Sequence, residues 1–339
     1  MNPVTILGIE TSCDETAASV VRDGRIVLSS VVSSQIDIHA RFGGVVPEIA
    51  SRAHVELLTP VIAEALVEAG VDETGIDAIA CTIGPGLIGS LLVGVSAAKA
   101  TALVWDVPFV GVNHLEAHFV AAFLEEPELE PPIVVLLVSG GHTLLVEVSE
   151  IGKYRVIGST IDDAAGEAFD KVARFLGLGY PGGPAIDREA MSGDPLAIRF
   201  PRGLIDDIGD HKHDFSFSGL KTSVINHVRK HPDVATADVC ASFQEAVVDV
   251  LVTKARRAAD ELGAKGLALA GGVAANSLLR ERLLDACTED GLHGFLPSRA
   301  MCTDNAAMIA ATGFYRLRDD GPTPLDTGAD PNLRITQSR

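Results

Sequence analysis

The sequence predicts an α/β protein made of two similar lobes, and two repeated patterns lead to this prediction. Three short apolar runs joined by polar turns occupy residues 4–32, and the same order recurs at residues 133–160. A short apolar strand, a glycine turn and a helix occupy residues 79–104, and this unit recurs at residues 266–286. Two copies of both patterns in one chain indicate an internal duplication, so we expect a ligand cleft between the lobes.

The individual elements follow from local patterns. In the first copy, apolar runs predict strands at residues 4–9, 17–21 and 26–32, with a hairpin turn at Asp23-Gly24. In the second copy, the corresponding strands are predicted at residues 133–138, 144–148 and 154–157. Each later strand leads through a glycine turn into an apolar helix, which gives strands at 79–83 and 266–270 and helices at 88–104 and 276–286.

These elements predict the division of the chain into lobes. We expect an N-terminal lobe formed by residues 1–112 with 311–330, and a C-terminal lobe formed by residues 113–310 that carries the metal and nucleotide site. The stretch from Asp319 onward is rich in Pro, Gly, Asp and Thr. We expect it to be loosely packed, with residues 331–339 as a loose tail.

Composition and charge restrict the classes of function. The chain has 46 acidic and 27 basic residues, which argues against an autonomous nucleic-acid binder unless a local basic patch or a partner supplies cations. Five cysteines without C-x-x-C spacing fit free thiols in a reducing cytoplasm. The most membrane-like run, residues 86–105, contains Lys99 and is predicted to be a buried helix. The absence of a signal peptide then predicts a soluble cytoplasmic protein with no membrane partner.

Two histidines form the first candidate site. If residues 113–118 are helical, His114 and His118 lie one turn apart on the same face, where two imidazoles can hold one divalent ion. The alternative is a polar helix face without a ligand. Glu116 points away from the pair, so this is not the H-E-x-x-H arrangement of a metalloprotease.

A third metal ligand must come from elsewhere, and Asp304 is the best candidate. Residues 302–308 start a late helix, where Thr303 or Asp304 can act simply as an N-cap. If Asp304 instead joins the two histidines, the three ligands leave coordination positions open. Such a set suits Fe(II) or Zn(II).

Glycine turns form the second candidate site. The turn Ser139-Gly140-Gly141-His142-Thr143 can direct backbone N–H groups toward an anion, although it can also be a plain hairpin. Gly271-Gly272, followed by Asn276 at a helix start, occupies the matched position in the second repeated unit. Two glycine turns in matched positions favour a nucleotide site.

Several acidic residues are candidates for further roles. Asp14 and Glu15 in the first hairpin turn are either solvated or face the cleft, where one of them can accept a proton. Asp170 ends an acidic stretch that is a solvated helix face by default. The rigid turn at residues 180–184 can bring Asp170 against a sugar, and Asp187 follows on the next helix. A candidate basic surface surrounds the segment 215–222; it consists of Arg199, Arg202, Lys212, Lys221, Arg229 and Lys230.

A series of motifs resembles one known family. These blocks are Ile9–Thr16, Gly43–Ser51, Gly84–Leu87, His114-x-Glu116-x-His118, Val138–Thr143, Asp162–Lys171, Tyr180–Pro184, Asp214–Thr222, Gly271–Asn276 and Cys302–Asn305. In this order, over about residues 4 to 315, they resemble the bacterial type of the universal tRNA threonylcarbamoyladenosine transferase, a family once described as O-sialoglycoprotein endopeptidases.

The resemblance implies an actin-like ATPase fold, of the sugar kinase and heat-shock ATPase class. It implies transfer of a threonylcarbamoyl group from threonylcarbamoyl-AMP to the exocyclic amine of the tRNA adenosine just 3′ of the anticodon. It assigns the metal ion, expected to be Fe(II) with Zn(II) as the alternative, to His114, His118 and Asp304. It assigns adenylate binding to Leu137, Val138, Ser139, Gly140, Gly141, Asp170, Gly183, Asp187 and Asn276. It also implies two partner proteins, a catalytically inactive paralogue and a small ATPase.

The expected chemistry assigns a proton acceptor as well. The adenine amine is a poor nucleophile, so its proton must be taken up during attack, and Asp14 or Glu15 is the candidate acceptor. Two other enzyme classes stay open: a metal-dependent glycopeptidase, and a small-molecule kinase of the same fold class. The metal ligands argue against a non-catalytic scaffold.

Overall fold

A computed structural model of the chain describes residues 3–126 and 128–335. These residues form two compact units, one made of the described parts of Met1–Pro127 and Thr303–Ser338, and the other of Glu128–Cys302. This division differs from the predicted lobes. Helix α4 (His114–Glu125) was expected in the second lobe, but it packs on α11 (Ala306–Asp319) and therefore belongs to the first unit.

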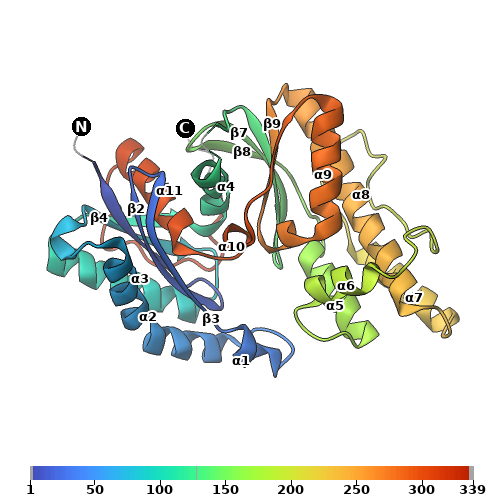
Figure 1. Cartoon of the computed structure of the whole chain (residues 1–339), viewed down its shortest axis with the longest axis horizontal. Helices are drawn as coiled ribbons and strands as arrows, with labels where there is room; N and C mark the ends of the chain where they lie inside the picture. The colour runs from blue at the N-terminus through green and yellow to red at the C-terminus, as the bar shows by residue number, and fades with distance from the viewer. Residues whose placement is uncertain (1–2, 127, 336–339) are drawn as a thin grey trace. The chain divides into compact units, whose positions relative to one another are not determined.

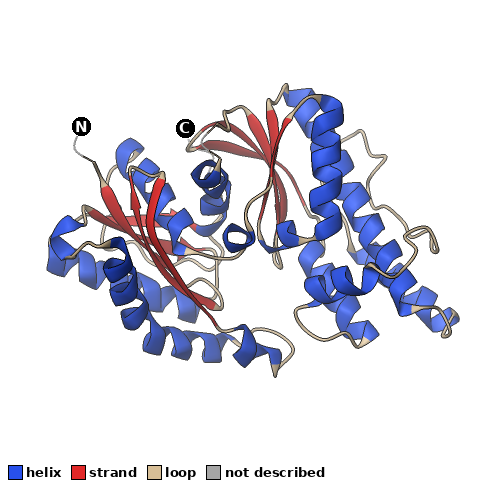
Figure 2. Ribbon diagram, viewed as in Figure 1, coloured by secondary structure: helices blue, strands red, loops and turns tan. Residues whose placement is uncertain are grey.

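The first unit contains a five-stranded sheet in the order β3-β2-β1-β4-β5 (Figure 2). Its strands are β1 (Thr5–Glu10), β2 (Glu15–Arg22), β3 (Ile26–Ser34), β4 (Ala78–Gly84) and β5 (Phe109–Asn113). The first three strands form an antiparallel meander, whereas β4 and β5 run parallel to β1. The loops at the carboxyl ends of β1, β4 and β5 therefore lie at one edge of the sheet, where ligands bind in α/β proteins.

Helices cover both faces of this sheet (Figure 1). The helices of this unit are α1 (Ile36–Ala40), α2 (Pro47–Ala69), the short 3₁₀ helix η1 (Glu73–Gly75), α3 (Ile88–Trp105), α4 and α11, of which α2, α3, α4 and α11 contact the sheet. Leu7 and Ile9 of β1 point into a core shared with α2 and α3. Gly8 points the other way, and a Cβ there would lie 2.3 Å from the Ala306 carbonyl oxygen. The missing side chain of Gly8 thus permits the close packing of α11 on β1.

The second unit repeats the sheet order as β8-β7-β6-β9-β10. Its strands are β6 (Ile133–Val138), β7 (Thr143–Glu150), β8 (Lys153–Ser159), β9 (Gly266–Ala270) and β10 (His293–Phe295). Its helices are α5 (Ala165–Leu176), α6 (Gly182–Ala190), α7 (Ser218–Lys230), α8 (Thr236–Leu262), η2 (Gly272–Ala275), α9 (Ser277–Asp290) and α10 (Arg299–Cys302). Again the first three strands form an antiparallel meander and the other two run parallel to the first. The matched order confirms the predicted duplicated α/β architecture.

The C-terminal stretch is better packed than predicted. Residues 320–335 form no helix or strand, but their backbone is bonded to the ends of β4 and β5. Asp330 N–H donates to the Ile83 carbonyl and Thr323 N–H to the Phe109 carbonyl, both at 2.8 Å. These bonds fasten the stretch to the sheet edge, which composition alone did not indicate. Residues 336–339 of the predicted tail lie outside the described residues.

Helix α3 is long and apolar enough to cross a membrane by composition, and about 33% of it is buried in the structure. Its buried residues include Leu91, Val95 and Ala98, which pack toward β4 and α2. The Lys99 ammonium donates to the Thr327 carbonyl. The predicted buried helix is therefore a helix of the first unit that buries only the face toward β4 and α2.

Candidate functional site

Helix α4 places the two predicted histidines. Asn113 ends β5 and caps the helix, because its side-chain oxygen accepts from the N–H groups of Leu115 and Glu116 at 2.9 and 3.3 Å. The cap starts the helix at His114, so His114 and His118 share one face. Their ring centroids are 4.8 Å apart in an edge-to-face arrangement.

Asp304 completes this group from the loop before α11. Its Oδ1 atom lies 3.4 Å from Nε2 of His114 and 3.3 Å from Nε2 of His118. The alternative N-cap role does not apply to Asp304, because Asn305 caps α11 by accepting from the Met308 N–H at 3.1 Å. The three ligand atoms lie within 4.8 Å of one another, so the group can hold a metal ion.

The buried carboxylate of Glu10 orients His114, a contact that the motif analysis missed. Its Oε2 atom lies 3.0 Å from Nδ1 of His114 and accepts from the Thr82 hydroxyl at 2.6 Å, and its side chain is fully buried. A carboxylate on Nδ1 leaves Nε2 as the metal-facing atom, which is the usual support for a ligating histidine. The available sequence signal was an acid at the end of an otherwise apolar strand.

The charges in this group favour a cation. Burial opposes protonation of His114, but the carboxylates of Asp304 and Glu10 overcome it and raise its pKa well above the usual value. Burial likewise opposes ionisation of Asp304, yet the two histidines hold its pKa below its usual range. The fully buried carboxylate of Glu10 and the partly buried one of Asp304 therefore hold a positive charge at His114. A divalent ion at Nε2 can replace that proton, so the residues present fit a metal ion.

We expect Glu10→Gln to weaken metal binding by about 10- to 100-fold, because the amide removes the negative charge on the Nδ1 side of His114. Competition with a chelator of known affinity measures this change. Glu150→Gln, which alters an exposed acid on β7, serves as the control and leaves the affinity unchanged. Equal affinities in the two variants would contradict the role of Glu10.

Glu116 has a structural partner. Both of its carboxylate oxygens bind the Arg316 guanidinium at 2.8 Å, and the Glu116 side chain is 2% exposed. This pair joins α4 to α11, the two elements on either side of the metal group. The prediction that Glu116 points away from the histidines is thus confirmed, and its carboxylate is engaged elsewhere.

We expect Glu116→Leu to lower the free energy of unfolding by about 2–3 kcal/mol, because it leaves the Arg316 charge without its main partner. This decrease in the free energy of unfolding is smaller than for a fully buried ion pair, because Arg316 also contacts Asp320 at 2.7 Å. Urea unfolding measures it. The double variant Glu116→Leu, Arg316→Met should recover part of the loss, and no recovery would contradict this explanation.

The predicted acidic turn, residues 10–16, lies in the same unit as the metal group. The Ser12 hydroxyl is 3.3 Å from Nδ1 of His114, and a Cβ on Gly86 would lie 2.6 Å from the Ser12 carbonyl oxygen. Burial, then Asp304 and Asp14, raises the pKa of Glu15 to about 9. Burial also raises the pKa of the Cys13 thiol, so Cys13 stays protonated and is not a nucleophile.

The raised pKa of Glu15 predicts a pH dependence of stability. Unfolded chains lose this proton near pH 4.5, whereas the metal-free native state keeps it up to about pH 9. The native state thus binds more protons between these values, and the free energy of unfolding falls as the pH rises through that window. Glu15→Gln has no such proton to lose, so its free energy of unfolding does not fall for this reason. The difference in free energy of unfolding between the variant and the wild type therefore increases as the pH rises from 4.5 to about 9. Urea unfolding with a chelator present tests this, and a constant difference would contradict it.

The second unit builds the glycine-turn site at the carboxyl ends of β6 and β9. The turn is closed by the Ser139 N–H, which donates to the His142 carbonyl at 2.8 Å. Two glycines allow other segments to reach it. A Cβ on Gly166 of α5 would lie 2.4 Å from the Ser139 carbonyl oxygen, and one on Gly271 would lie 2.6 Å from the Val138 carbonyl oxygen. Open space surrounds the Cβ positions of Gly140 and Gly141.

The other predicted adenylate residues cluster around α6. Asp170 accepts from the Gly182 N–H at 2.8 Å, and burial raises its pKa. Asp187 accepts from the Ser277 hydroxyl at 2.6 Å, and its Oδ1 atom lies 3.4 Å from the Asn276 amide nitrogen. Asn276 also caps α9. These side chains thus hold α5, α6 and the start of α9 together.

Half of the predicted basic surface is neutralised, because three of its six cations pair with acids. Lys221 pairs with Asp163 and Lys212 with Glu261, both at 2.5 Å, while Arg202 pairs with Asp249 at 3.1 Å. Sequence distance concealed these acids, which come from α8 and the loop before α5. Among the described residues, no acid pairs with the other three cations, which are Arg199, Arg229 and Lys230.

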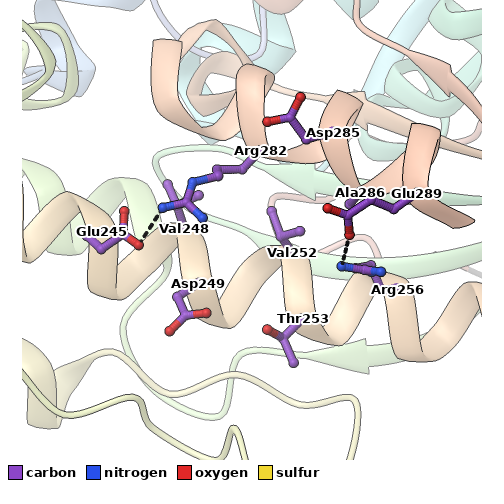
Figure 3. A pocket seen from close by; sticks show the side chains of 10 residues that line it. All are labelled: Glu245, Val248, Asp249, Val252, Thr253, Arg256, Arg282, Asp285, Ala286 and Glu289. Atoms are coloured by element: carbon purple, nitrogen blue, oxygen red, sulfur yellow. Dashed lines mark hydrogen bonds and ion pairs between the residues drawn. The ribbon is translucent and has the colours of Figure 1, made fainter. Parts of the chain in front are cut away.

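A separate pocket between α8 and α9 contains none of the predicted site residues (Figure 3). It has a volume of about 190 Å³. Arg282 pairs with Glu245 at 2.7 Å and Arg256 with Glu289 at 3.0 Å across it. These ion pairs join α8 to α9, so the pocket is part of the interface between two helices.

Solved structures resemble this fold. The A component of (R)-2-hydroxyglutaryl-CoA dehydratase from Acidaminococcus fermentans matches 93% of this chain and 100% of its own, with a TM-score of 0.56 and 15% sequence identity. HypF from T. kodakarensis matches 94% of this chain and 49% of its own, with a TM-score of 0.63 and 16% identity. The fold and the His114 group define an α/β protein with an actin-like ATPase fold and a candidate metal centre.

Sequence comparison identifies the family. The family model described as tRNA N6-adenosine threonylcarbamoyltransferase matches residues 26–311. Proteins with that name are 57% identical in Anaeromyxobacter dehalogenans (strain 2CP-C) and 50% in Clostridioides difficile (strain 630). These matches cover 97% and 99% of this chain, and 99% and 100% of the relatives. The chain belongs to the TsaD family of tRNA N6-adenosine threonylcarbamoyltransferases, as its motifs predicted.

Proposed function

We propose that this protein transfers the threonylcarbamoyl group of L-threonylcarbamoyl-AMP to the exocyclic amine of the tRNA adenosine 3′-adjacent to the anticodon, releasing AMP. Family membership supports tRNA adenosine as the acceptor. The observation that carries the proposal is the group of His114, His118 and Asp304, which is supported by the buried carboxylate of Glu10.

We propose Fe(II) as the bound ion, with Zn(II) as the alternative, because two imidazoles and one carboxylate leave coordination positions open. When bound, the ion supplies Lewis-acid stabilisation of negative charge on a phosphoryl oxygen. The protein's part is to hold the ligands in place. Asn113 sets the start of α4, Glu10 orients His114, and the Glu116–Arg316 pair fastens α4 to α11.

The adenylate is proposed to bind at the glycine turn of the second unit, through the backbone of Leu137, Val138, Ser139, Gly140 and Gly141. The open space around Gly140 and Gly141 supports this assignment. Asp170 and Asp187 are proposed to shape the site by holding α6 and α9, since both carboxylates already accept hydrogen bonds there. Gly183 and Asn276 complete the proposed set.

In the proposed transfer step, one bond to the carbamoyl carbon forms and another breaks. The adenine amine nitrogen attacks the carbamoyl carbon, the bond from that carbon to the phosphate oxygen breaks, and AMP leaves with the electron pair. The amine loses one proton, for which Asp14 is the proposed acceptor. Glu15 keeps its own proton at neutral pH in the metal-free protein, so it can accept one only when a cation near Asp304 lowers its pKa.

The proposed partners are tRNA, a catalytically inactive paralogue and a small ATPase, and the proposed location is the cytoplasm. Partner proteins suit a chain with net charge −19 in which three of the six cations of the predicted basic surface are paired with acids. Cations for the tRNA phosphates can then come from a partner.

Reconstitution tests this proposal. Purified protein is incubated with threonylcarbamoyl-AMP and unmodified tRNA, with and without the partners, and nucleosides are analysed by mass spectrometry. We expect threonylcarbamoyladenosine and AMP in equal amounts. ATP-dependent phosphorylation of a sugar, without transfer to tRNA, would instead identify a kinase. Cleavage of a glycopeptide that depends on His114 would identify a peptidase, a function that the Glu116–Arg316 pair disfavours.

A further inference from the structure

A line of buried side chains joins residues 35–46 to the acidic turn of the first unit. His39 and His54 are both fully buried, and Gln35 is 1% exposed. The Val46 N–H donates to Nδ1 of His39 at 3.3 Å, and Nε2 of His39 lies 3.2 Å from Oε1 of Gln35. Gln35 Nε2 lies 3.4 Å from Nδ1 of His54, whose Nε2 lies 3.0 Å from the Cys13 carbonyl oxygen.

The two ends of this line decide where its protons reside. A backbone N–H can only donate, so Nδ1 of His39 is an acceptor and Nε2 carries the proton. That proton goes to Oε1 of Gln35, which leaves the Gln35 amide as donor to Nδ1 of His54. Nε2 of His54 therefore carries the proton that the Cys13 carbonyl accepts. Both ends demand the same direction, and the assigned tautomers satisfy every buried group in the line.

Other contacts agree with this assignment. The Thr16 hydroxyl lies 2.7 Å from Nδ1 of His54 and can donate to it. The Gln35 amide has a second acceptor, the Ala50 carbonyl at 3.4 Å. Burial lowers the pKa of His54, so its ring is neutral at neutral pH, as the line requires.

The line ends on the peptide that carries Asp14. On one side, the Cys13 carbonyl accepts from His54 at 3.0 Å and from the Ser90 hydroxyl at 3.5 Å. On the other side, the Asp14 carbonyl accepts from the Gln35 N–H at 2.9 Å. Gln35 thus contacts the turn directly through its backbone and indirectly through His54. The orientation of Asp14 and Glu15 depends on both contacts.

We infer that His54 is a positioning residue for the acidic turn, and that His39 and Gln35 act through it by holding the His54 ring with Nδ1 toward the Gln35 amide and Nε2 toward the Cys13 carbonyl. This inference rests on the proposed function, in which Asp14 accepts the proton of the attacking amine. Removing His39 leaves Oε1 of Gln35 without its buried donor, so the Gln35 side chain can shift and hold His54 less firmly. The Cys13 carbonyl can only accept, so the proton stays on Nε2 while the ring and the turn that it contacts become less ordered.

Steady-state transfer assays test the positioning role. We expect His54→Leu and His39→Leu each to lower kcat about 10- to 100-fold with little change in KM for tRNA, because a displaced acceptor slows the chemical step. His54→Gln can still donate to the Cys13 carbonyl and should recover most of kcat. His213→Leu is the matched control, since it removes a buried histidine that bonds Glu261 at 3.1 Å in the second unit. It leaves kcat unchanged.

A tautomer measurement gives a readout independent of activity. In protein labelled with nitrogen-15 histidine, we expect the His54 proton on Nε2 in both the wild type and His39→Leu, with faster exchange of that proton with solvent in His39→Leu, and with the resonance assigned by its loss in His54→Gln. A wild-type proton on Nδ1, or unchanged kcat in both leucine variants, overturns the inference. If instead the wild type fails to modify tRNA while the tautomers follow the prediction, the proposed function fails and the buried line stands.

Discussion

His118→Ala is expected to remove the bound metal ion and to reduce threonylcarbamoyl transfer by about 1000-fold or more. The estimate follows because a Lewis-acid ion supplies several kcal/mol of stabilisation to the transition state. The fold should persist, since α4 keeps its Asn113 cap and the Glu116–Arg316 pair. Metal content by mass spectrometry, transfer rate and circular dichroism together measure the effect.

The chain offers a matched control for this variant. His227 and His231 on and just after α7 have the same spacing, and their ring centroids are 4.6 Å apart. Among the described residues, no carboxylate completes a three-ligand group there. His231→Ala should therefore leave metal content and transfer unchanged. Retained metal and full activity in His118→Ala would contradict the proposed metal centre.

Gly166→Ala is expected to raise KM for threonylcarbamoyl-AMP by about 10- to 100-fold while leaving metal content unchanged. The new Cβ would lie 2.4 Å from the Ser139 carbonyl oxygen and 2.9 Å from Cα of Gly140, so the glycine turn or α5 must move. Overpacking of this kind typically costs about 1–3 kcal/mol, which here falls on adenylate binding.

Gly219→Ala serves as the control for Gly166→Ala. Gly219 also lies in the first turn of a helix of the second unit, but no atom lies within 4 Å of its Cβ position. Steady-state kinetics with varied threonylcarbamoyl-AMP compare the two variants. An unchanged KM in Gly166→Ala would show that the glycine turn does not bind the adenylate.

Much of the fold could be predicted because its signals are local. Alternating apolar runs and glycine turns predicted both meanders and both strand–turn–helix units, and the structure places each near its predicted bounds. The unit boundary could not be predicted in this way, since it depends on α4 packing against α11, which lies about 190 residues further along the chain. The hydrogen bonds from Thr323 and Asp330 to the sheet edge join residues that are even further apart in sequence.

The candidate site likewise depends on both local signals and contacts that are distant in sequence. Helical spacing alone placed His114 and His118 on one face, and the family motifs pointed to Asp304. Spacing alone could not decide whether Asp304 is an N-cap or a metal ligand. The structure decides this, because Asn305 is the residue that caps α11. The predicted basic surface was weakened for the opposite reason, because acids remote in sequence lie beside three of its cations.

By itself, the sequence determined the elements, their duplication, the family and the chemical types of the site residues, because periodicity, turn residues and motifs are properties of neighbouring positions. Only the tertiary structure decided which buried groups meet: Glu10 with His114, Glu116 with Arg316, and His54 with the Cys13 carbonyl. Such contacts join residues between 41 and 200 positions apart. Their strength comes from shared burial away from water, which no single stretch of the chain encodes.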